Sequence, residues 1–372
     1  MQIPLARPDI SDAEFLAIKP VIDSGWLGMG TLVGDLETAV CEFVGSDHCI
    51  AVSSGTAALH LALEIADVRG AEVVVPSMTF AATVQAVLAA GGVPVFAECR
   101  PEDLNLDVED AGRRITPRTK AIVPVHYAGK PVDMDHLLEV ASAAGVTVVE
   151  DAAHAFGSTW QGKAIGAFGH LTCFSFDPIK TITCGEGGAV CTSNPEWAER
   201  IRCVRNLGIT HNTWDRYQSE RPWMYEVAER GYRAHMSNIN AAIGLVQMNR
   251  VEELIADRRR VAAQYDEAFA HLPDISCLDH DLAQHVPFCY TVLIHGHRRD
   301  AFMTAMKAAG VGVGILYLPN HTQPAFQAFT TSLPVTERLS AEYVSLPLFG
   351  GMQQDAVDYV IEHVRTFMTT DL

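Results

Sequence analysis

Residues 146–192 read VTVVEDAAHAFGSTWQGKAIGAFGHLTCFSFDPIKTITCGEGGAVCT, a stretch in which short apolar runs alternate with turn residues. The runs are VTVVED (146–151), LTCFSF (171–176) and GGAVCT (187–192). Each run has the length of a β-strand, and short apolar runs bounded by turns are typical of a sheet that is buried on both faces.

Four more runs of the same kind precede this stretch, with helix-like segments such as TAALHLALEIA (56–66) between them. They are CIAVS (49–53), EVVVP (72–76), VPVFAE (93–98) and AIVPVH (121–126). Any single run could belong to a buried helix, but seven in succession with turns between them favour strands. Strands that alternate with amphipathic helices predict an α/β fold with a mostly parallel, seven-stranded sheet covered on both faces.

The pattern changes near residue 239, where about thirty residues with helical periodicity predict a long helix that links two domains. After this helix we expect a strand, a helix, a strand and a terminal helix: PFCYTVLIHG (287–296), RRDAFMTAMKAAG (298–310), VGVGILYLP (311–319) and MQQDAVDYVIEHVRTFM (352–368). The sequence therefore predicts a large domain over residues 1–250 and a smaller α+β domain over residues 251–372.

The composition is that of a globular protein. Of the 372 residues, 48% are hydrophobic and 19% are charged. The 27 Lys and Arg against 45 Asp and Glu give a net charge of −18, which disfavours binding to DNA, RNA or an anionic membrane. No apolar run reaches the ~18 residues of a membrane span. MQIPLARPDISDAEF (1–15) lacks the apolar centre of a signal peptide, so we expect a cytoplasmic protein.

The nine cysteines show no C-x-x-C spacing, which excludes zinc-ribbon and thioredoxin-type sites. Several lie inside apolar runs, such as Cys173 in LTCFSF. We therefore expect buried free thiols in a reducing compartment and no metal site.

Three chemically informative features follow predicted strands, and ligands of open α/β sheets bind at the carboxyl ends of the strands. SGTA (54–57) opens a helix whose free N–H groups could bind an anion, although such a segment is more often only a helix cap. Asp151 ends a buried strand and needs a donor or a cation as its partner. Lys180 lies among apolar residues, where desolvation makes an amine a usable nucleophile, although most lysines lie at the surface.

Together these features are what pyridoxal 5′-phosphate (PLP) requires: a lysine for a Schiff base, an acid for the pyridine nitrogen and a phosphate site. Other nucleotide-type sites do not fit. GEGG (185–188) lacks the Lys-Ser/Thr pair of a P-loop, and GMG (28–30) precedes the first strand and lacks the third glycine of a nicotinamide site.

At these residues the chain resembles the DegT/DnrJ/EryC1/StrS sugar aminotransferase family of fold-type I PLP enzymes, whose large domain is aspartate-aminotransferase-like. The similarity covers nearly the whole chain. It is carried by SGWLGMG (24–30), AVSSGTAALH (51–60), PSMTFAAT (76–83), TPRTKAIVPVHYAGKPVDMD (116–135), VVEDAAHAFG (148–157), FSFDPIKTITCGEGGAV (174–190), SNINAAIGLVQMNRV (237–251), GVGILYLPNHTQPAF (312–326) and SLPLF (345–349). PVHYAGKPVDMD and IKTITCGEGG are most similar to the branch that aminates C4 of nucleotide-linked 4-keto sugars, which includes the UDP-4-keto-arabinose aminotransferase.

The resemblance implies catalytic roles for three residues. Lys180 matches the Schiff-base lysine, Asp151 the acid paired with the pyridine nitrogen, and His154 the position beside the cofactor ring. The implied cofactor contacts further include the ring-stacking Phe80 and the phosphate-binding Gly55, Thr56 and Ser175. The residues matched to the sugar nucleotide are Trp26, Tyr317 and His321.

The chain departs from the family pattern at three positions. Asp177 stands where many relatives have His, and its carboxylate could alter the basicity of Lys180 or point to solvent. Arg233 stands where many relatives have an Asn that reaches the cofactor phosphate of the other subunit, a contact that Arg could also make. Leu316 replaces a His common before the retained Tyr317.

The implied reaction is transfer of an amino group from L-glutamate to the keto carbon, at C4, of a nucleotide-linked keto-deoxysugar, by a ping-pong route through pyridoxamine phosphate in a homodimer with shared sites. A 3-keto sugar or a cyclitol ketone of the scyllo-inosose type is the alternative acceptor. Lys180 and Asp151 argue against a dehydratase and against a non-catalytic regulatory homologue. Lys163, Arg216 and Arg233 are the cations available to a nucleotide diphosphate.

Overall fold

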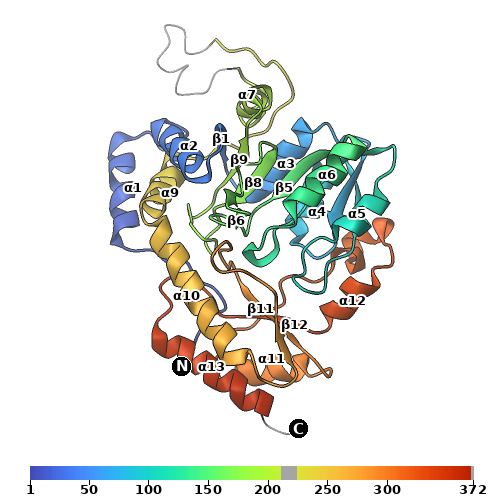
Figure 1. Ribbon diagram of the computed structural model, residues 1–372. Helices are drawn as coiled ribbons and strands as arrows, with labels where there is room; N and C mark the ends of the chain where they lie inside the picture. The colour runs from blue at the N-terminus through green and yellow to red at the C-terminus, as the bar shows by residue number, and fades with distance from the viewer. Residues whose placement is uncertain (211–223, 370–372) are drawn as a thin grey trace.

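A seven-stranded sheet lies at the centre of the larger part of the molecule in the computed structural model, which describes residues 1–210 and 224–369 (Figure 1). Its strands are β1 (His48–Val52), β2 (Glu72–Pro76), β3 (Val93–Ala97), β4 (Thr119–Ile122), β5 (Thr147–Asp151), β8 (Leu171–Ser175) and β9 (Gly188–Thr192). The order is β1-β9-β8-β5-β4-β2-β3, and only β9 runs antiparallel to its two neighbours. Each of the seven predicted runs is a strand, and the mostly parallel sheet is confirmed.

Helices cover both faces of this sheet (Figure 1). Side chains on one strand alternate between the two faces, so each strand contributes to two apolar clusters. Along β1, Cys49 and Ala51 pack in one apolar cluster, whereas Ile50 and Val52 pack in the other. The first cluster includes α2 (Thr31–Val44), α5 (Val108–Arg114), α6 (Met134–Ala144) and α9 (Asn238–Asn249). The second includes α3 (Gly55–Ile65), α4 (Ala81–Ala89) and α7 (Pro195–Val204). Outside these layers, α1 (Asp12–Ser24) packs on α9.

The smaller part of the molecule has an antiparallel three-stranded sheet with the order β10-β11-β12. The strands are β10 (Ile275–Cys277), β11 (Tyr290–Ile294) and β12 (Tyr343–Leu346), and the helices are α10 (Val251–Phe269), α11 (Arg299–Ala308), α12 (Pro334–Ser340) and α13 (Gln354–Thr369). The predicted strand near residue 290 and both predicted helices are confirmed. The division at residue 250 stays a prediction, and Ile3 from the N-terminal end packs in the core of this smaller part.

Residues 311–319 were predicted to form a strand, and this is wrong. The segment makes only isolated bridges, from Val311 to Ile3 and from Gly314 to Ser345. The two partners lie in different segments, so neither pairing continues for the length of a strand. Glycine permits this close approach, because a Cβ at Gly312 would lie 2.6 Å from the backbone nitrogen of Leu5.

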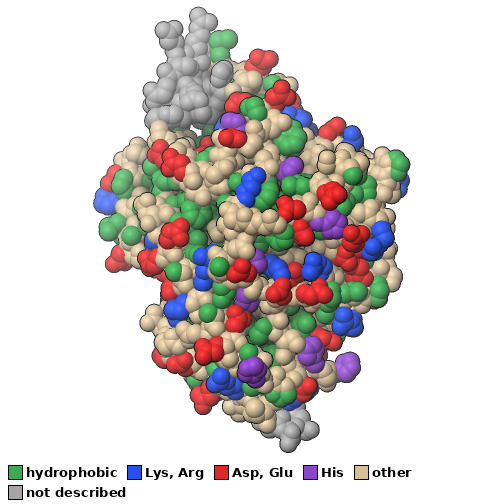
Figure 2. All heavy atoms as spheres, in the orientation of Figure 1, with side chains coloured by type: hydrophobic (Ala, Val, Ile, Leu, Met, Phe, Trp, Pro, Cys, Tyr) green, Lys and Arg blue, Asp and Glu red, His purple; other side chains and the backbone are tan. Residues whose placement is uncertain are grey.

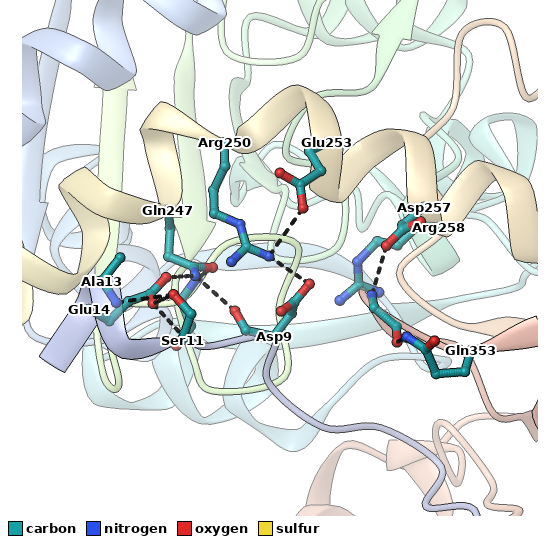
Figure 3. Close-up of polar contacts among 12 residues, drawn as sticks. Asp9, Ser11, Ala13, Glu14, Gln247, Arg250, Glu253, Asp257, Arg258 and Gln353 are labelled. Carbon is teal, nitrogen blue, oxygen red and sulfur yellow. Dashed lines mark hydrogen bonds and ion pairs between the residues drawn. The ribbon is translucent and has the colours of Figure 1, made fainter.

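The predicted long helix is two helices, α9 and α10, which are interrupted at Arg250. The N-terminal segment crosses at this break (Figure 3). The Arg250 guanidinium lies 2.7 Å from the Asp9 carboxylate, and the Gln247 side-chain amide donates to the Asp9 carbonyl (2.9 Å) and to Glu14 (2.6 Å). Contacts with a segment more than 200 residues away in sequence therefore accompany a break that the local periodicity does not show.

The remaining described elements are short. They are the two-stranded ribbon of β6 (Thr159–Trp160) and β7 (Lys163–Ala164), and the 3₁₀ helices η1 (Tyr127–Gly129), η2 (Asn320–Thr322) and η3 (Pro324–Phe329). On the face shown in Figure 2, Asp and Glu side chains are spread over both parts of the molecule. Within residues 1–210 and 224–369, every helix is too short or too polar to cross a bilayer.

Candidate active site

A cavity of about 250 Å³ opens at the carboxyl ends of β5 and β8, next to the amino end of α3. Most of the predicted site residues line it: Gly55, Thr56, Phe80, Asp151, His154, Ser175, Lys180 and Tyr317. Two positions where the chain departs from the family pattern, Asp177 and Leu316, line it as well. Residues from five separate stretches of sequence thus meet in one place.

The amino end of α3 forms one wall of the cavity. Ser54 caps the helix, and its hydroxyl accepts the Ala57 N–H at 3.1 Å. The N–H groups of Gly55 and Thr56 precede the first intrahelical bonds, so they are available to an anion. A Cβ at Gly55 would lie 2.7 Å from the Ser175 Cβ, so glycine is needed here for the close packing of α3 on β8. The wall therefore combines backbone donors with the hydroxyls of Thr56 and Ser175.

Asp151 ends β5, lines the cavity and is held by two donors. The Thr83 hydroxyl donates to Oδ2 at 2.7 Å, and the Ala153 N–H donates to Oδ1 at 3.2 Å. Burial raises the pKa of Asp151, while the Thr83 bond, the Ala153 bond and the nearby Lys180 oppose this rise. Thr83 in turn bonds Thr79 at 2.7 Å. Sequence reasoning gave no role to either threonine, although both lie in the PSMTFAAT motif beside Phe80.

Lys180 is half-buried and is the one Lys or Arg among the described residues that line the cavity. Desolvation lowers the pKa of its amine to about 8, although the carboxylates of Asp177 and Asp151 act in the opposite direction. Asp177 accepts the Ile179 N–H at 3.1 Å and so caps the turn that leads to Lys180. Asp177 lines the cavity beside Lys180, and its effect on the basicity of the lysine stays a prediction.

The rings of His154 and Tyr317 both line the cavity and lie 5.8 Å apart between centroids. The His154 Nε2 lies 3.1 Å from the Tyr317 hydroxyl, and the imidazole stacks on Phe288 with 4.0 Å between centroids. Burial, assisted by the charge of Lys180, lowers the pKa of His154 well below its usual value, so the ring is neutral. Its buried Nδ1 has no partner among the described residues and is available to a bound group. Phe288 was not identified from the sequence.

Three predicted residues do not line this cavity. The Trp26 indole donates to the Met29 carbonyl at 2.9 Å, and Arg233 forms a bridge with Asn206. His321 is 2% exposed, with Nδ1 2.6 Å from the Ser77 hydroxyl and Nε2 3.3 Å from Glu337. Both ring nitrogens are engaged, so His321 holds η2 to the end of β2, and its expected contact with the sugar stays a prediction.

The cations proposed for a nucleotide diphosphate are also absent from the described lining. Lys163 lies on β7 with Nζ 4.7 Å from the centroid of the Phe168 ring, and Arg233 lies outside the cavity. Arg216 lies outside the described residues. Glu186 of the glycine-rich loop does line the cavity, which adds a further carboxylate that sequence reasoning had not assigned.

The donor set of this cavity fits PLP. The amino end of α3 with Ser175 suits the phosphate, and Asp151 suits the ring nitrogen. The lowered pKa of Lys180 suits Schiff-base formation, and the unpartnered Nδ1 of His154 leaves a polar group for the ring.

Comparison with known proteins agrees with this fit. The profile of the DegT/DnrJ/EryC1/StrS aminotransferase family matches residues 8–365. The sugar aminotransferase CalS13 from Micromonospora echinospora is 32% identical, with a TM-score of 0.91 over 98% of this chain and 100% of that chain. Spr1654 from Streptococcus pneumoniae in its PLP form is 28% identical, with a TM-score of 0.91 over 98% of each chain. PseC from Helicobacter pylori, an aminotransferase involved in the biosynthesis of pseudoaminic acid, is 27% identical, with a TM-score of 0.91 over 99% of each chain.

These similarities confirm the predicted fold-type I architecture and PLP as the cofactor. The family match spans both parts of the molecule, from α1 to α13. The chain therefore belongs to the DegT/DnrJ/EryC1/StrS aminotransferase family and is a PLP-dependent aminotransferase.

Proposed function

We propose that this enzyme transfers the amino group of L-glutamate to the C4 keto carbon of a nucleotide-linked keto-deoxysugar, which yields an amino sugar and 2-oxoglutarate. The observation that carries the proposal is the meeting of Lys180, Asp151 and the amino end of α3 in one cavity. Similarity to CalS13, a sugar aminotransferase, supports a sugar as the acceptor. The motifs PVHYAGKPVDMD and IKTITCGEGG support C4 as the carbon that is aminated.

Two side chains perform the proton chemistry of this reaction. Bound PLP would supply an acceptor for the amino group and for the electron pair released at the donor Cα. Lys180 accepts the Cα proton, because a pKa of about 8 leaves part of its amine uncharged near neutral pH. The same amine would deliver that proton to the cofactor C4′, and in the second half of the reaction it would take a proton from C4′ and donate it to the sugar carbon. Asp151, fixed by Thr83, would hold a proton on the pyridine nitrogen.

The two substrates use one site in turn, which gives ping-pong kinetics. The cavity has a volume of about 250 Å³, and Lys180 is the amine that the described lining offers to either substrate. The glutamate therefore has to leave as 2-oxoglutarate before the keto sugar enters.

A second copy of the chain completes the site in our proposal. At the cavity mouth, Phe80 is 57% exposed and Leu318 is 54% exposed, and both line an adjoining hollow of about 520 Å³. Exposed apolar side chains at a cavity mouth support a covering surface. We assign that surface to the second subunit of a homodimer, whose Arg233 would donate to the cofactor phosphate. A cytoplasmic location is part of the same proposal.

Absorption spectroscopy tests the donor half of the reaction. The purified protein is loaded with PLP, and the near-ultraviolet and visible spectrum is recorded before and after addition of L-glutamate. We expect a cofactor band that shifts with glutamate and is absent in Lys180→Ala. A band that ignores amino donors would contradict the proposed use of glutamate.

A panel of acceptors tests the sugar half. Nucleotide-linked 4-keto and 3-keto sugars with different bases, and a cyclitol ketone of the scyllo-inosose type, are incubated with enzyme and glutamate, and amino products are measured by mass spectrometry. We expect the 4-keto nucleotide sugars to react fastest. Faster amination of a 3-keto sugar or of the cyclitol would move the assignment to that acceptor.

A further inference from the structure

Arg258 on α10 places a guanidinium in the protein interior without a carboxylate partner among the described residues. Its side chain is 2% exposed, and desolvation lowers its pKa to about 10, so it remains charged at neutral pH. Its Nη2 donates to the carbonyls of Ile179 (3.3 Å) and Lys180 (3.0 Å). Its Nη1 donates to the carbonyls of Phe288 (3.0 Å) and Pro287 (3.5 Å). One guanidinium thus joins the Lys180 turn to the chain that enters β11.

The side chains of the two joined segments meet in the cavity. The Lys180 amine lies 4.1 Å from the centroid of the Phe288 ring, and Phe288 also stacks on His154. An aromatic face attracts an ammonium group, so this ring is a resting place for the amine when it is not bonded to the cofactor. The position of the ring relative to the amine depends on the two backbones that Arg258 ties together.

We propose that Arg258 is a positioning residue for Lys180: it ties the 179–180 turn to residues 287–288 and so holds the free amine over the Phe288 ring. The inference rests on the role of Lys180 in the proposed function. It goes beyond that function because it assigns a task to two residues outside the cavity motifs. During the reaction the amine is released and must stay within reach of the atoms between which it moves a proton.

The chemistry of the four contacts explains why arginine occupies this position. A buried cation is costly to desolvate, and an apolar side chain of similar length would pack with less cost. Only a guanidinium presents donors in a rigid, planar fork that can serve two separate chain segments at once. A purely space-filling role would not require this group.

Loss of Arg258 is expected to raise the pKa of the Lys180 amine. The charged groups that act on the Lys180 amine are Asp177, Asp151 and Arg258. The Cys289 thiol and the His154 ring also lie nearby, and burial keeps both of them neutral at neutral pH. Removing the positive charge of Arg258 favours the ammonium form, and a released turn admits water, so these two effects raise the pKa of Lys180. Looser contact with the Phe288 ring opposes them, but we expect the first two effects to outweigh it. Loss of the Phe288 ring acts in the opposite direction, because the ring favours the ammonium form.

The test measures the amine itself. Full-length protein freed of cofactor is labelled with a trace of acetic anhydride from neutral to strongly alkaline pH, and acetylation of Lys180 is followed by peptide mass spectrometry. Wild-type protein should give a midpoint near 8. We expect Arg258→Met to raise the midpoint by about 1 and Phe288→Leu to lower it by about 0.5.

Arg260→Met is the matched control, because Arg260 lies on the same helix and donates to the Met352 carbonyl at 2.7 Å, away from Lys180. Its midpoint should equal that of the wild type. A folded Arg258→Met protein with a wild-type midpoint would overturn the inference. If that variant does not fold, the labelling midpoints of Arg258→Lys and Phe288→Leu test the inference. Two unchanged midpoints, or two midpoints that move in the same direction, would overturn it. Failure to aminate any keto sugar would instead refute the substrate assignment and leave these midpoints unaffected.

Discussion

Two neighbouring carboxylates at the end of β5, Glu150 and Asp151, lie on opposite faces of the sheet and have different surroundings. Asp151 lines the cavity beside Lys180. Glu150 is 0% exposed and lies in a closed group in which the Thr172 hydroxyl donates to Oε1 at 2.6 Å and His126 Nε2 lies 3.0 Å from Oε2. The Val132 N–H donates to His126 Nδ1, which directs the remaining ring proton to Glu150. Burial alone therefore does not mark a catalytic acid, because both are buried and only Asp151 reaches the cavity.

The largest loss of activity is expected at Lys180, on the face of the sheet where Asp151 lines the cavity. Lys180→Met removes the amine that moves the proton while keeping a side chain of similar length. We expect amination to fall by about 10⁴-fold or more. The measurement is the rate of amino-sugar formation by the PLP-loaded protein. A loss of less than tenfold would show that another group moves the proton.

Asp151→Asn should have the next largest effect, because it removes the negative charge that faces the ring nitrogen but keeps an acceptor for Thr83. We expect a loss of about 10²- to 10³-fold in the rate of amination, with thermal stability close to that of the wild type. Equal losses in Asp151→Asn and Glu150→Gln would remove the distinction between the two carboxylates.

The buried amine should also make stability depend on pH. In the folded protein the pKa of Lys180 is about 8, below its ordinary value of 10.5, so the folded state disfavours the charged form. In cofactor-free protein this cost is fully present below pH 8 and disappears as the pH rises towards 10.5. The stability advantage of Lys180→Met over the wild type should therefore shrink by about 3 kcal/mol over that range. Urea unfolding of both proteins at several pH values measures it, and a difference that stays constant with pH would contradict the burial of this amine.

Glu150→Gln should act on stability and not on chemistry. The Gln amide cannot accept from both Thr172 and His126, so one buried donor loses its partner. We expect the free energy of unfolding to fall by about 1–3 kcal/mol, and the activity per folded molecule to stay within a few-fold of the wild type. Chemical unfolding and activity at equal folded concentration provide the two values. A Glu150→Gln protein that is stable but inactive would place Glu150 in the catalytic machinery.

The smallest expected effect is at Asp177, where the negative charge raises the pKa of Lys180. Asp177→Asn keeps the acceptor for the Ile179 N–H and removes the charge. We expect the pKa of Lys180 to fall below 8, by about 0.5. The acetic anhydride labelling described above measures this shift, and an unchanged or higher midpoint would show that the carboxylate does not act on the amine.

Local sequence was sufficient to predict the strands of the large sheet. The apolar runs predicted all the strands of the large sheet, because a strand buried on both faces is recognisable from its own residues. VGVGILYLP was equally apolar but is not a strand, since its pairing partners are split between Ile3 and Ser345. The interruption at Arg250 was missed for a related reason, because the contacts that accompany it come from Asp9 and Glu14 at the other end of the chain.

For the site, residue types in motifs were sufficient to predict Lys180, Asp151 and the amino end of α3, which line one cavity, because PLP chemistry requires a lysine, an acid and a phosphate site whatever surrounds them. Residue type did not reveal that His321 is enclosed between Ser77 and Glu337, or that Arg258 and Phe288 approach Lys180. Apart from the local contact between His321 and Glu337, these relations join positions about 80 to 240 residues apart and depend on how the smaller part packs on the large sheet. Motifs therefore specified the chemistry, whereas long-range packing decided which side chains reach the cavity, because burial and hydrogen-bond geometry depend on neighbours that are distant in the chain.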